Sequence, residues 1–208
     1  MTATDLYHSP CLIRPTDGVI IAHAMMRAKV RADDVNSKNL TQKTTHRQRQ
    51  SASVRALLAQ VMTDCGIVGN FIDGQFPYQI ISDNARHFVS FSHSGHAIAL
   101  IVAATPCAID IEQNTVNPAI AERYYHANEL DIIKANPSHA QHDIDTLWRL
   151  KECAIKLSVG KLHAGMQADF SACLAGIHRT QPVLIDHQQW RIYNEPTDRL
   201  TAVFECNI

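Results

Sequence analysis

Two segments of this chain constrain its fold most, because each sets charged residues among apolar ones. The first, Pro106–Glu112, reads Pro-Cys-Ala-Ile-Asp-Ile-Glu, and the second, Trp148–Lys156, reads Trp-Arg-Leu-Lys-Glu-Cys-Ala-Ile-Lys. Apolar side chains at these spacings must be buried, while the carboxylates and lysines between them need water or partners. The two segments therefore predict a strand and a helix that each present charged groups on one side.

Alternation predicts the strand. Asp110 and Glu112 alternate with Ile109 and Ile111, so both acids share one face while both isoleucines enter the core. Like charges this close repel unless a cation or a proton lies between them, and Mg²⁺ typically binds one or two protein carboxylates, waters and substrate phosphate oxygens. The alternative is an edge strand whose two acids simply face water.

Helical spacing predicts the second element. Its recurring apolar residues are Ile144, Leu147, Trp148, Ala154 and Ile155. We expect Asp143 or Asp145 to cap the start of this helix and Gly160 to end it. Glu152 and Lys156 then lie one turn apart. The alternative for this pair is an exposed ion pair that adds only about 0.2–0.5 kcal/mol to helix stability.

Upstream, Phe88–Gly95 reads Phe-Val-Ser-Phe-Ser-His-Ser-Gly. His93 and His96 could bind zinc, but no Cys-x-x-Cys or second histidine pair stands nearby to complete four ligands. A serine nucleophile activated by His93 is a weaker interpretation, because no Gly-x-Ser-x-Gly turn is present. The segment can also be a turn that enters a strand from about Ala97 to Ala104.

These three motifs, in this order, resemble those of the 4′-phosphopantetheinyl transferases, specifically the larger, surfactin-synthetase-activating type. Members carry a Gly-Ile-Asp-x-Glu strand, a Trp-x-x-Lys-Glu-x-x-x-Lys helix and a Phe-Asn-x-Ser-His-Ser-Gly segment, and the resemblance extends from about Arg55 to Gly165. It implies an α+β fold of two pseudo-symmetric halves, each a long helix with a small three-stranded antiparallel sheet, and coenzyme A in the cleft between them. We expect the halves to be 1–104 and 105–208, within one compact unit.

The resemblance also implies an activity. The family transfers the phosphopantetheine arm of coenzyme A to a serine hydroxyl of an acyl or peptidyl carrier protein and releases adenosine 3′,5′-bisphosphate. By this resemblance Asp110, Glu112 and Glu152 hold Mg²⁺ on the pyrophosphate, so that Asp110 is also catalytic, Glu152 is the general base, and Lys156 offsets charge on the phosphates. Another metal-dependent phosphohydrolase or nucleotidyl transferase, or a non-catalytic relative that binds coenzyme A or a carrier, stays open.

The resemblance further implies a set of coenzyme contacts. They are Lys43, Arg55, Gln75, Ser92, His93, Lys151 and Lys156. Ser92 and His93 match the pair that grips the nucleotide end, and protonated His93 is a partner for the 3′-phosphate. Gln75 stands where relatives usually have a lysine, and Ala108 replaces a glycine whose backbone approaches the pyrophosphate. Both departures bear on the affinity for coenzyme A.

Charge and composition narrow the setting. The formal net charge is −1, yet the stretch between Asp34 and Asp64 has no acid and several lysines and arginines, among them Lys43 and Arg55. This favours a confined anionic partner, such as phosphate or an acidic carrier protein, over nucleic acid. Six cysteines without paired spacing and the lack of a signal-peptide pattern predict a cytoplasmic protein without a membrane partner, and members of the larger type usually work as monomers.

Remaining segments give local predictions. Polar residues around Ser37–Ser53 and Pro137–His142 are typical of loops, and an apolar helix is expected over 56–62. Beyond Met166, the pattern predicts antiparallel strands. They cover 183–185, 190–193 and 200–204.

Overall fold

The structure is a computed structural model that describes residues 6–27, 46–74, 76–158, 162–177 and 180–205. In chain order the first elements are β1 (Cys11–Ile13), β2 (Val19–Met25), α1 (His46–Asp64), β3 (Asn70–Ile72), β4 (Tyr78–Ile81), β5 (Arg86–Ser94) and β6 (Ala97–Ala103). The later elements are β7 (Cys107–Ile111), α2 (Pro118–Tyr124), α3 (Ala127–Ala135), the 3₁₀ helix η2 (Pro137–His139), α4 (Ala140–Leu157), α5 (Leu162–Gln167), α6 (Ser171–Leu174), β8 (Val183–His187), β9 (Trp190–Glu195) and β10 (Leu200–Glu205).

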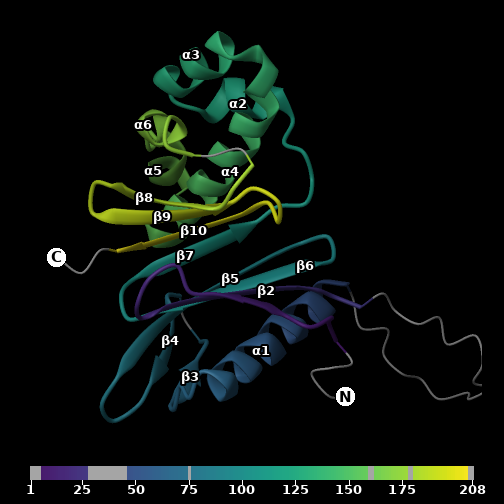
Figure 1. Cartoon of the computed structure of the whole chain (residues 1–208), viewed down its shortest axis with the longest axis vertical. Helices are drawn as coiled ribbons and strands as arrows, with labels where there is room; N and C mark the ends of the chain where they lie inside the picture. The colour runs from purple at the N-terminus through teal and green to yellow at the C-terminus, as the bar shows by residue number, and fades with distance from the viewer. Residues whose placement is uncertain (1–5, 28–45, 75, 159–161, 178–179, 206–208) are drawn as a thin grey trace, which may run out of the picture.

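The strands form two antiparallel sheets that face each other. One sheet has the order β1-β2-β6-β5-β4-β3 and the other β7-β10-β9-β8, and the chain passes from the first to the second between Ala103 and Cys107. Figure 1 shows the layers from bottom to top: α1, the six-stranded sheet, the four-stranded sheet, and the group α2 to α6. The predicted α+β class is confirmed. The sheets have six and four strands rather than three each, and the division at 104 and 105 into two domains stays a prediction.

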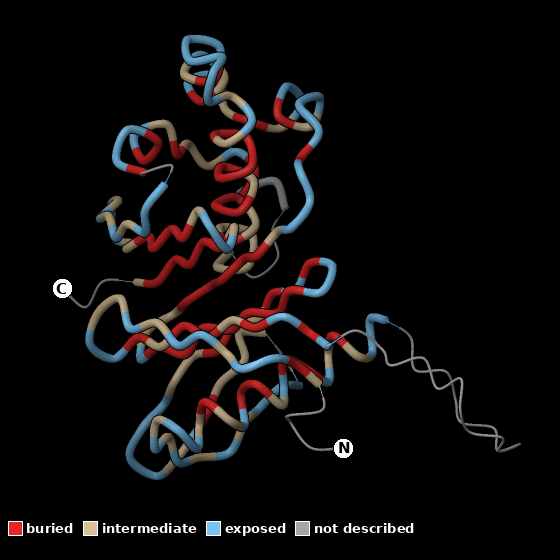
Figure 2. The backbone as a smooth tube through the Cα atoms, turned by 45° about the vertical axis from the view of Figure 1, so that its right-hand side comes forward, coloured by how far each residue is buried: buried red, intermediate tan, exposed pale blue. Residues whose placement is uncertain are grey.

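Three buried clusters hold these layers together. Leu57 and Val61 of α1 pack on the six-stranded sheet, and Leu147 and Leu150 of α4 pack on the four-stranded sheet. The third cluster lies between the sheets and draws on both of them. It includes Val19, Ile21, Ile101, Ile109, Ile111, Tyr193, Ala202 and Phe204. Figure 2 shows the continuous buried strands where the two sheets meet.

Strand β7 shows the predicted alternation. Ile109 and Ile111 enter the cluster between the sheets, whereas Ala108 belongs to the cluster under α4. Asp110 shares the side of Ala108 because successive side chains alternate. The three predicted C-terminal strands are also confirmed, as β8, β9 and β10. They are antiparallel and join β7 through β10.

Two predicted helix boundaries are wrong. Helix α1 begins at His46, within the predicted loop Ser37–Ser53. The sequence did not indicate this start because the first turns of the helix bury the polar residues Gln50 and Ser53 and so lack an apolar pattern. Helix α4 begins at Ala140, which places the expected caps inside it. It ends at Leu157, and Gly160 lies outside the described residues.

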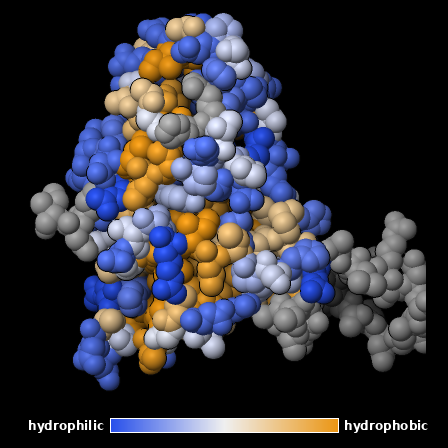
Figure 3. Space-filling view, viewed as in Figure 1, coloured by the Kyte–Doolittle hydropathy of each residue, from blue (hydrophilic) through white to orange (hydrophobic). Residues whose placement is uncertain are grey.

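The surface is mixed in character. Figure 3 shows apolar atoms mainly in the middle of this face, with polar side chains over most of the rest. Among the helices that the structure describes, none combines the length and apolar character needed for a membrane crossing. The five cysteines in the described ranges are all unpaired.

Candidate functional site

Asp110 lies at the centre of the candidate site. Its side chain is on the α4 side of β7, and only 7% of the residue is exposed. Its Oδ1 accepts a hydrogen bond from Ser92 Oγ (2.8 Å) and lies 3.1 Å from Lys156 Nζ, which also donates to the Ile109 carbonyl (2.6 Å). Strand β5, strand β7 and helix α4 therefore meet at this carboxylate.

Glu112 is the first residue after β7, and hydrogen bonds hold both its side chain and its backbone. Its Oε1 accepts hydrogen bonds from Ser94 Oγ and from the backbone N–H of Asn114 (2.8 Å). Arg199 donates from Nε to the Glu112 carbonyl (2.7 Å) and from Nη2 to Asp145 Oδ2 (2.8 Å). These contacts tie the segment after β7 to both the β9–β10 turn and α4.

One face of α4 carries a row of charged groups. Arg149, Glu152 and Lys156 recur at the i, i+3 and i+7 spacing that puts residues on one face of a helix. Arg149 is 2% exposed, and its Nε donates to Thr201 Oγ1 (3.1 Å), whose residue pairs with Asp110 across β10 and β7. Burial lowers the pKa of Arg149 to about 10, although Asp110 opposes the shift. Sequence reasoning missed Arg149, whose spacing from Glu152 and Lys156 could have indicated it.

The ionisable groups are coupled. Burial raises the pKa of Glu152, and the nearby charges of Asp110 and Glu112 raise it further, while Lys156 opposes the shift. Burial by itself would lower the pKa of Lys156, but the attraction of Asp110 and Glu152 outweighs it and the pKa is raised. Glu152 is thus the acid of this group whose proton is held more tightly than usual, and Lys156 stays protonated.

The donor set suits a hard divalent cation. Within the described residues, neither Asp110 Oδ2 nor Glu112 Oε2 takes part in a hydrogen bond, and the Glu152 carboxylate has none. These oxygens are the ligand type that Mg²⁺ prefers. In the described ranges no three His, Cys, Asp or Glu side chains lie close enough to hold a metal ion as they stand. Shared coordination of one ion by Asp110, Glu112 and Glu152 therefore stays a prediction.

Ser92 and His93 point to opposite faces of β5. The Ser92 hydroxyl is buried and is used within the protein, since it also accepts from the Ile111 N–H (3.2 Å). The His93 ring is exposed on the side of α1. Partial desolvation lowers its pKa, and the positive charges of Lys156, Arg47 and His46 lower it further.

Basic side chains gather at the β5–β6 turn, beside the start of α1. His46 Nε2 hydrogen-bonds with the Gly95 carbonyl (3.0 Å), and its ring lies edge-on to that of His96. Gln50 Nε2 donates to the same carbonyl (3.1 Å). The sequence placed Arg47 in a basic stretch but gave His46 no role, because only the fold brings α1 next to His93.

Lys151 is a correction to the predicted coenzyme contacts. Its side chain is fully buried, and its Nζ lies 2.8 Å from Glu129 Oε2 and donates to the carbonyls of Met166 (3.0 Å) and Ala168 (2.9 Å). The ammonium also lies over the ring of Tyr125. Lys151 therefore stabilises the core of the second part of the chain, and we remove it from the set.

The other predicted contacts differ in what the structure says of them. Arg55 is exposed on α1 and pairs with Asp73 (3.0 Å), so its contact with coenzyme A stays a prediction. Lys43 and Gln75 lie outside the described residues. Ala108 is fully buried in the cluster under α4, so its methyl group packs in the core.

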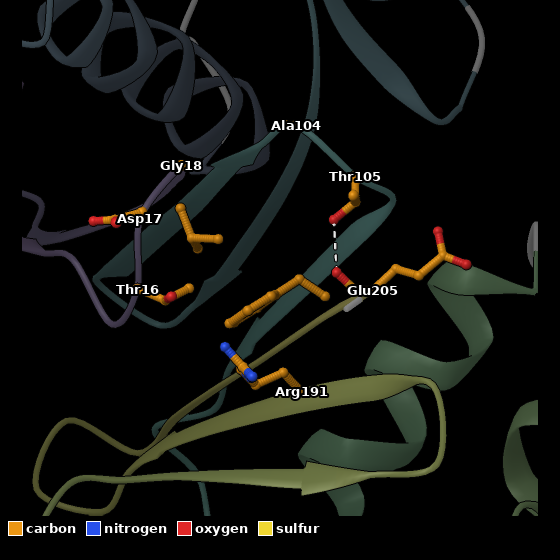
Figure 4. A pocket seen from close by; sticks show the side chains of 9 residues that line it. Thr16, Asp17, Gly18, Ala104, Thr105, Arg191 and Glu205 are labelled. Carbon is orange, nitrogen blue, oxygen red and sulfur yellow. Dashed lines mark hydrogen bonds between the residues drawn. The ribbon is translucent and has the colours of Figure 1, made fainter. Parts of the chain in front are cut away.

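A cavity of about 250 Å³ lies at the far end of the sheets, beyond the start of β7. Figure 4 shows Arg191 reaching toward it, with Asp17 and Glu205 on opposite sides and Thr105 bonded to the Glu205 carbonyl (2.9 Å). It is separate from the candidate site, which lies where β7 ends at Ile111 and β5 ends at Ser94.

Comparison with known families agrees with two of the three motifs, those of β7 and α4, and does not extend to Phe88–Gly95. Residues 106–204, which include β7, α4 and all but the last residue of the four-stranded sheet, match the sequence model of the 4′-phosphopantetheinyl transferase superfamily. The match supports that superfamily and, with it, a transferase activity. No curated protein matches the chain.

Proposed function

We propose that this protein transfers the 4′-phosphopantetheine group of coenzyme A to a serine of an acyl or peptidyl carrier protein and releases adenosine 3′,5′-bisphosphate. One observation carries the proposal. The matched segment brings the acidic residues Asp110, Glu112 and Glu152 and the positively charged Lys156 into one electrostatic site at the edge where the two sheets meet. Membership of the whole chain in the larger, surfactin-synthetase-activating type is part of the same proposal.

The residues take distinct roles in this reaction. Asp110, Glu112 and Glu152 would hold Mg²⁺, which supplies charge neutralisation on the diphosphate when bound. Glu152 accepts the proton of the carrier serine, directly or through water, as the serine oxygen attacks phosphorus. The bond between the two phosphates of coenzyme A breaks, and Lys156 stabilises the charge that develops on the departing bisphosphate.

The basic group at the β5–β6 turn suits the nucleotide end of the coenzyme. Arg47 and His46 help to lower the pKa of His93 there, and a 3′-phosphate would favour the protonated form of His93. A monomeric state and a cytoplasmic location are further parts of the proposal, together with the absence of nucleic-acid partners.

The test is to incubate the protein with coenzyme A, Mg²⁺ and unmodified carrier proteins from fatty-acid, polyketide and peptide synthesis, and to weigh the carriers by intact-mass spectrometry. We expect one carrier class to gain the mass of one phosphopantetheine. A carrier whose acceptor serine is replaced by alanine is the matched control and should gain nothing. Cleavage of coenzyme A without a gain in carrier mass would point instead to a phosphohydrolase.

A second candidate is binding of coenzyme A or a carrier without transfer. It is favoured by the Lys156 ammonium, which lies on Asp110 Oδ1 and holds one of the oxygens of the predicted metal ligand. Calorimetry that detects coenzyme binding, together with no mass gain on any carrier, would support it.

A further inference from the structure

The outer edge of β7 is closed by side chains instead of by another strand. On its inner edge β7 pairs with β10, and the Glu112 N–H, which follows the strand, points the same way to the Arg199 carbonyl (3.1 Å). Alternate amides must then point outward, and these are the N–H groups of Ile109, Ile111 and Gln113. Each donates to a serine hydroxyl of β5: Ser90 (3.3 Å), Ser92 (3.2 Å) and Ser94 (3.1 Å).

The match depends on a shared spacing. The serines recur every second residue along β5, and the outward amides recur every second residue along β7, so the same offset in sequence serves all three bonds. This serine ladder, defined by Ser90, Ser92 and Ser94, joins the two sheets without a backbone pairing between them.

Two hydroxyls of the serine ladder also act as donors. Ser92 accepts from the Ile111 N–H and donates to Asp110 Oδ1 (2.8 Å), and Ser94 accepts from the Gln113 N–H and donates to Glu112 Oε1. A hydroxyl that accepts from an amide becomes a better donor, because bonds in such a chain polarise one another. The single O–H donor of each of these two hydroxyls is therefore directed at one of the two acids.

The consequence is an orientation of both carboxylates. In Asp110 and Glu112 the oxygen that faces β5 accepts the serine hydrogen bond. The second oxygen of each carboxylate has no hydrogen-bond partner among the described residues, so it is left for a ligand. Ser90 differs, since in the described part of the chain the only hydrogen bond of its hydroxyl is the one from the Ile109 N–H. The chain thus contains its own internal control.

We propose that Ser92 and Ser94 are positioning residues that aim Asp110 and Glu112 at a divalent cation, whereas Ser90 only joins the strands. The inference rests on the proposed function for the identity of the ligand. It assigns Ser92 a role in orienting Asp110, in addition to the coenzyme contact that the resemblance implies. Groups that orient metal ligands typically change metal affinity 10- to 100-fold when they are removed.

The test uses Mn²⁺ as a probe, with free Mn²⁺ measured by electron paramagnetic resonance at a coenzyme A concentration that saturates each variant. We expect Ser92→Ala and Ser94→Ala each to weaken Mn²⁺ binding by about tenfold, and Ser90→Ala by less than about twofold. Ser92→Thr keeps the hydroxyl and should retain most of the affinity. Equal losses in all three alanine variants, no loss in any, or a wild type that binds no Mn²⁺ would overturn the proposal.

Amide hydrogen exchange of the wild type provides a measurement that does not depend on variants folding. The Ile109, Ile111 and Gln113 amides should be protected although no strand pairs its backbone with this edge of β7, and rapid exchange at all three would also overturn the proposal. The mass assay is read separately. If the wild type and the serine variants show the expected differences in Mn²⁺ affinity but the wild type modifies no carrier, the proposed function is refuted and the positioning role stays intact.

Discussion

At the scale of residues, the candidate site is a group of acidic and basic side chains in which the charge of Asp110 helps to raise the pKa of Glu152 and of Lys156. The positive groups Lys156 and Arg149 reach Asp110 from α4, while Glu112 is balanced by hydroxyl and amide donors. The ionised form of Glu152 is the least stabilised of the three carboxylates, because burial and two like charges act against it. Such a carboxylate is suited to taking up a proton.

We predict that Glu152→Gln separates activity from stability. Carrier modification should fall at least about 100-fold, because the proton acceptor is lost. The free energy of unfolding near pH 7 should be unchanged or higher. The pKa of Glu152 is raised in the folded state, so its contribution to stability falls as pH rises through that pKa, and the variant should lose this slope.

Urea denaturation at several pH values, together with the mass assay, checks this prediction. The control is Glu122→Gln on the exposed side of α2, which should alter neither activity nor stability by much. Normal turnover in Glu152→Gln would contradict the role of general base.

We predict that coenzyme A binding is coupled to proton uptake by His93. The lowered pKa keeps this ring largely neutral near pH 7, and a bound phosphate favours the charged form, so affinity should rise as pH falls from 8 to 6. Calorimetry in buffers of different ionisation enthalpy measures the uptake. It should vanish in His93→Gln and persist in His139→Gln, and identical uptake in both variants would refute the assignment.

At the scale of elements, α4 serves two environments at once. Lys156 points toward β7, whereas Lys151 is turned toward α3, the end of α5 and the residue that follows α5. Glu129 of α3 is fully buried, and besides Lys151 it accepts from the Phe170 N–H (2.8 Å). This buried pair fixes how α3 and the loop around Phe170 pack against α4, the helix that carries Glu152.

We predict that Lys151→Met lowers the free energy of unfolding by about 3–5 kcal/mol, because it leaves the Glu129 carboxylate buried without its cation. Arg55→Gln is the contrasting control, since its pair with Asp73 is exposed and is worth at most about 1 kcal/mol. Denaturant titrations of both variants give the comparison. A similar small loss in both would mean that the buried pair adds little to stability.

At the scale of the whole molecule, two sheets share one layer of buried side chains. Val19 and Ile21 come from one sheet, and Ile109 and Phe204 from the other. Each large apolar side chain buried in this way contributes roughly 1.5–3 kcal/mol. Without the other sheet, neither residues 1–104 nor residues 105–208 can bury the apolar side chains that they contribute to this shared layer.

We therefore predict a single unfolding transition for the intact chain and no cooperative folding of either half expressed by itself. Both tryptophans, Trp148 and Trp190, lie after residue 104, so their fluorescence reports the second half, while far-UV circular dichroism reports both. Coincident curves are expected. Two separate transitions, or a soluble and cooperatively folded half, would contradict the prediction.

Local patterns in the sequence determined several parts of this protein. The alternation around Asp110 predicted β7 and the burial of its isoleucines, and helical spacing predicted α4 and the common side of Glu152 and Lys156. These succeeded because strand and helix periods involve only neighbours in the chain. The start of α1 was missed for the same reason, since buried Gln50 and Ser53 do not form an apolar pattern.

Only the tertiary structure decided which partners these residues have. Lys151 and Lys156 stand about 140° apart around a helix, but the sequence does not say which of them meets a buried acid and which meets the site. The serine ladder likewise requires β5 to lie beside the outer edge of β7. Such contacts depend on how two sheets pack across a shared core, and that packing is set by side chains far apart in the chain.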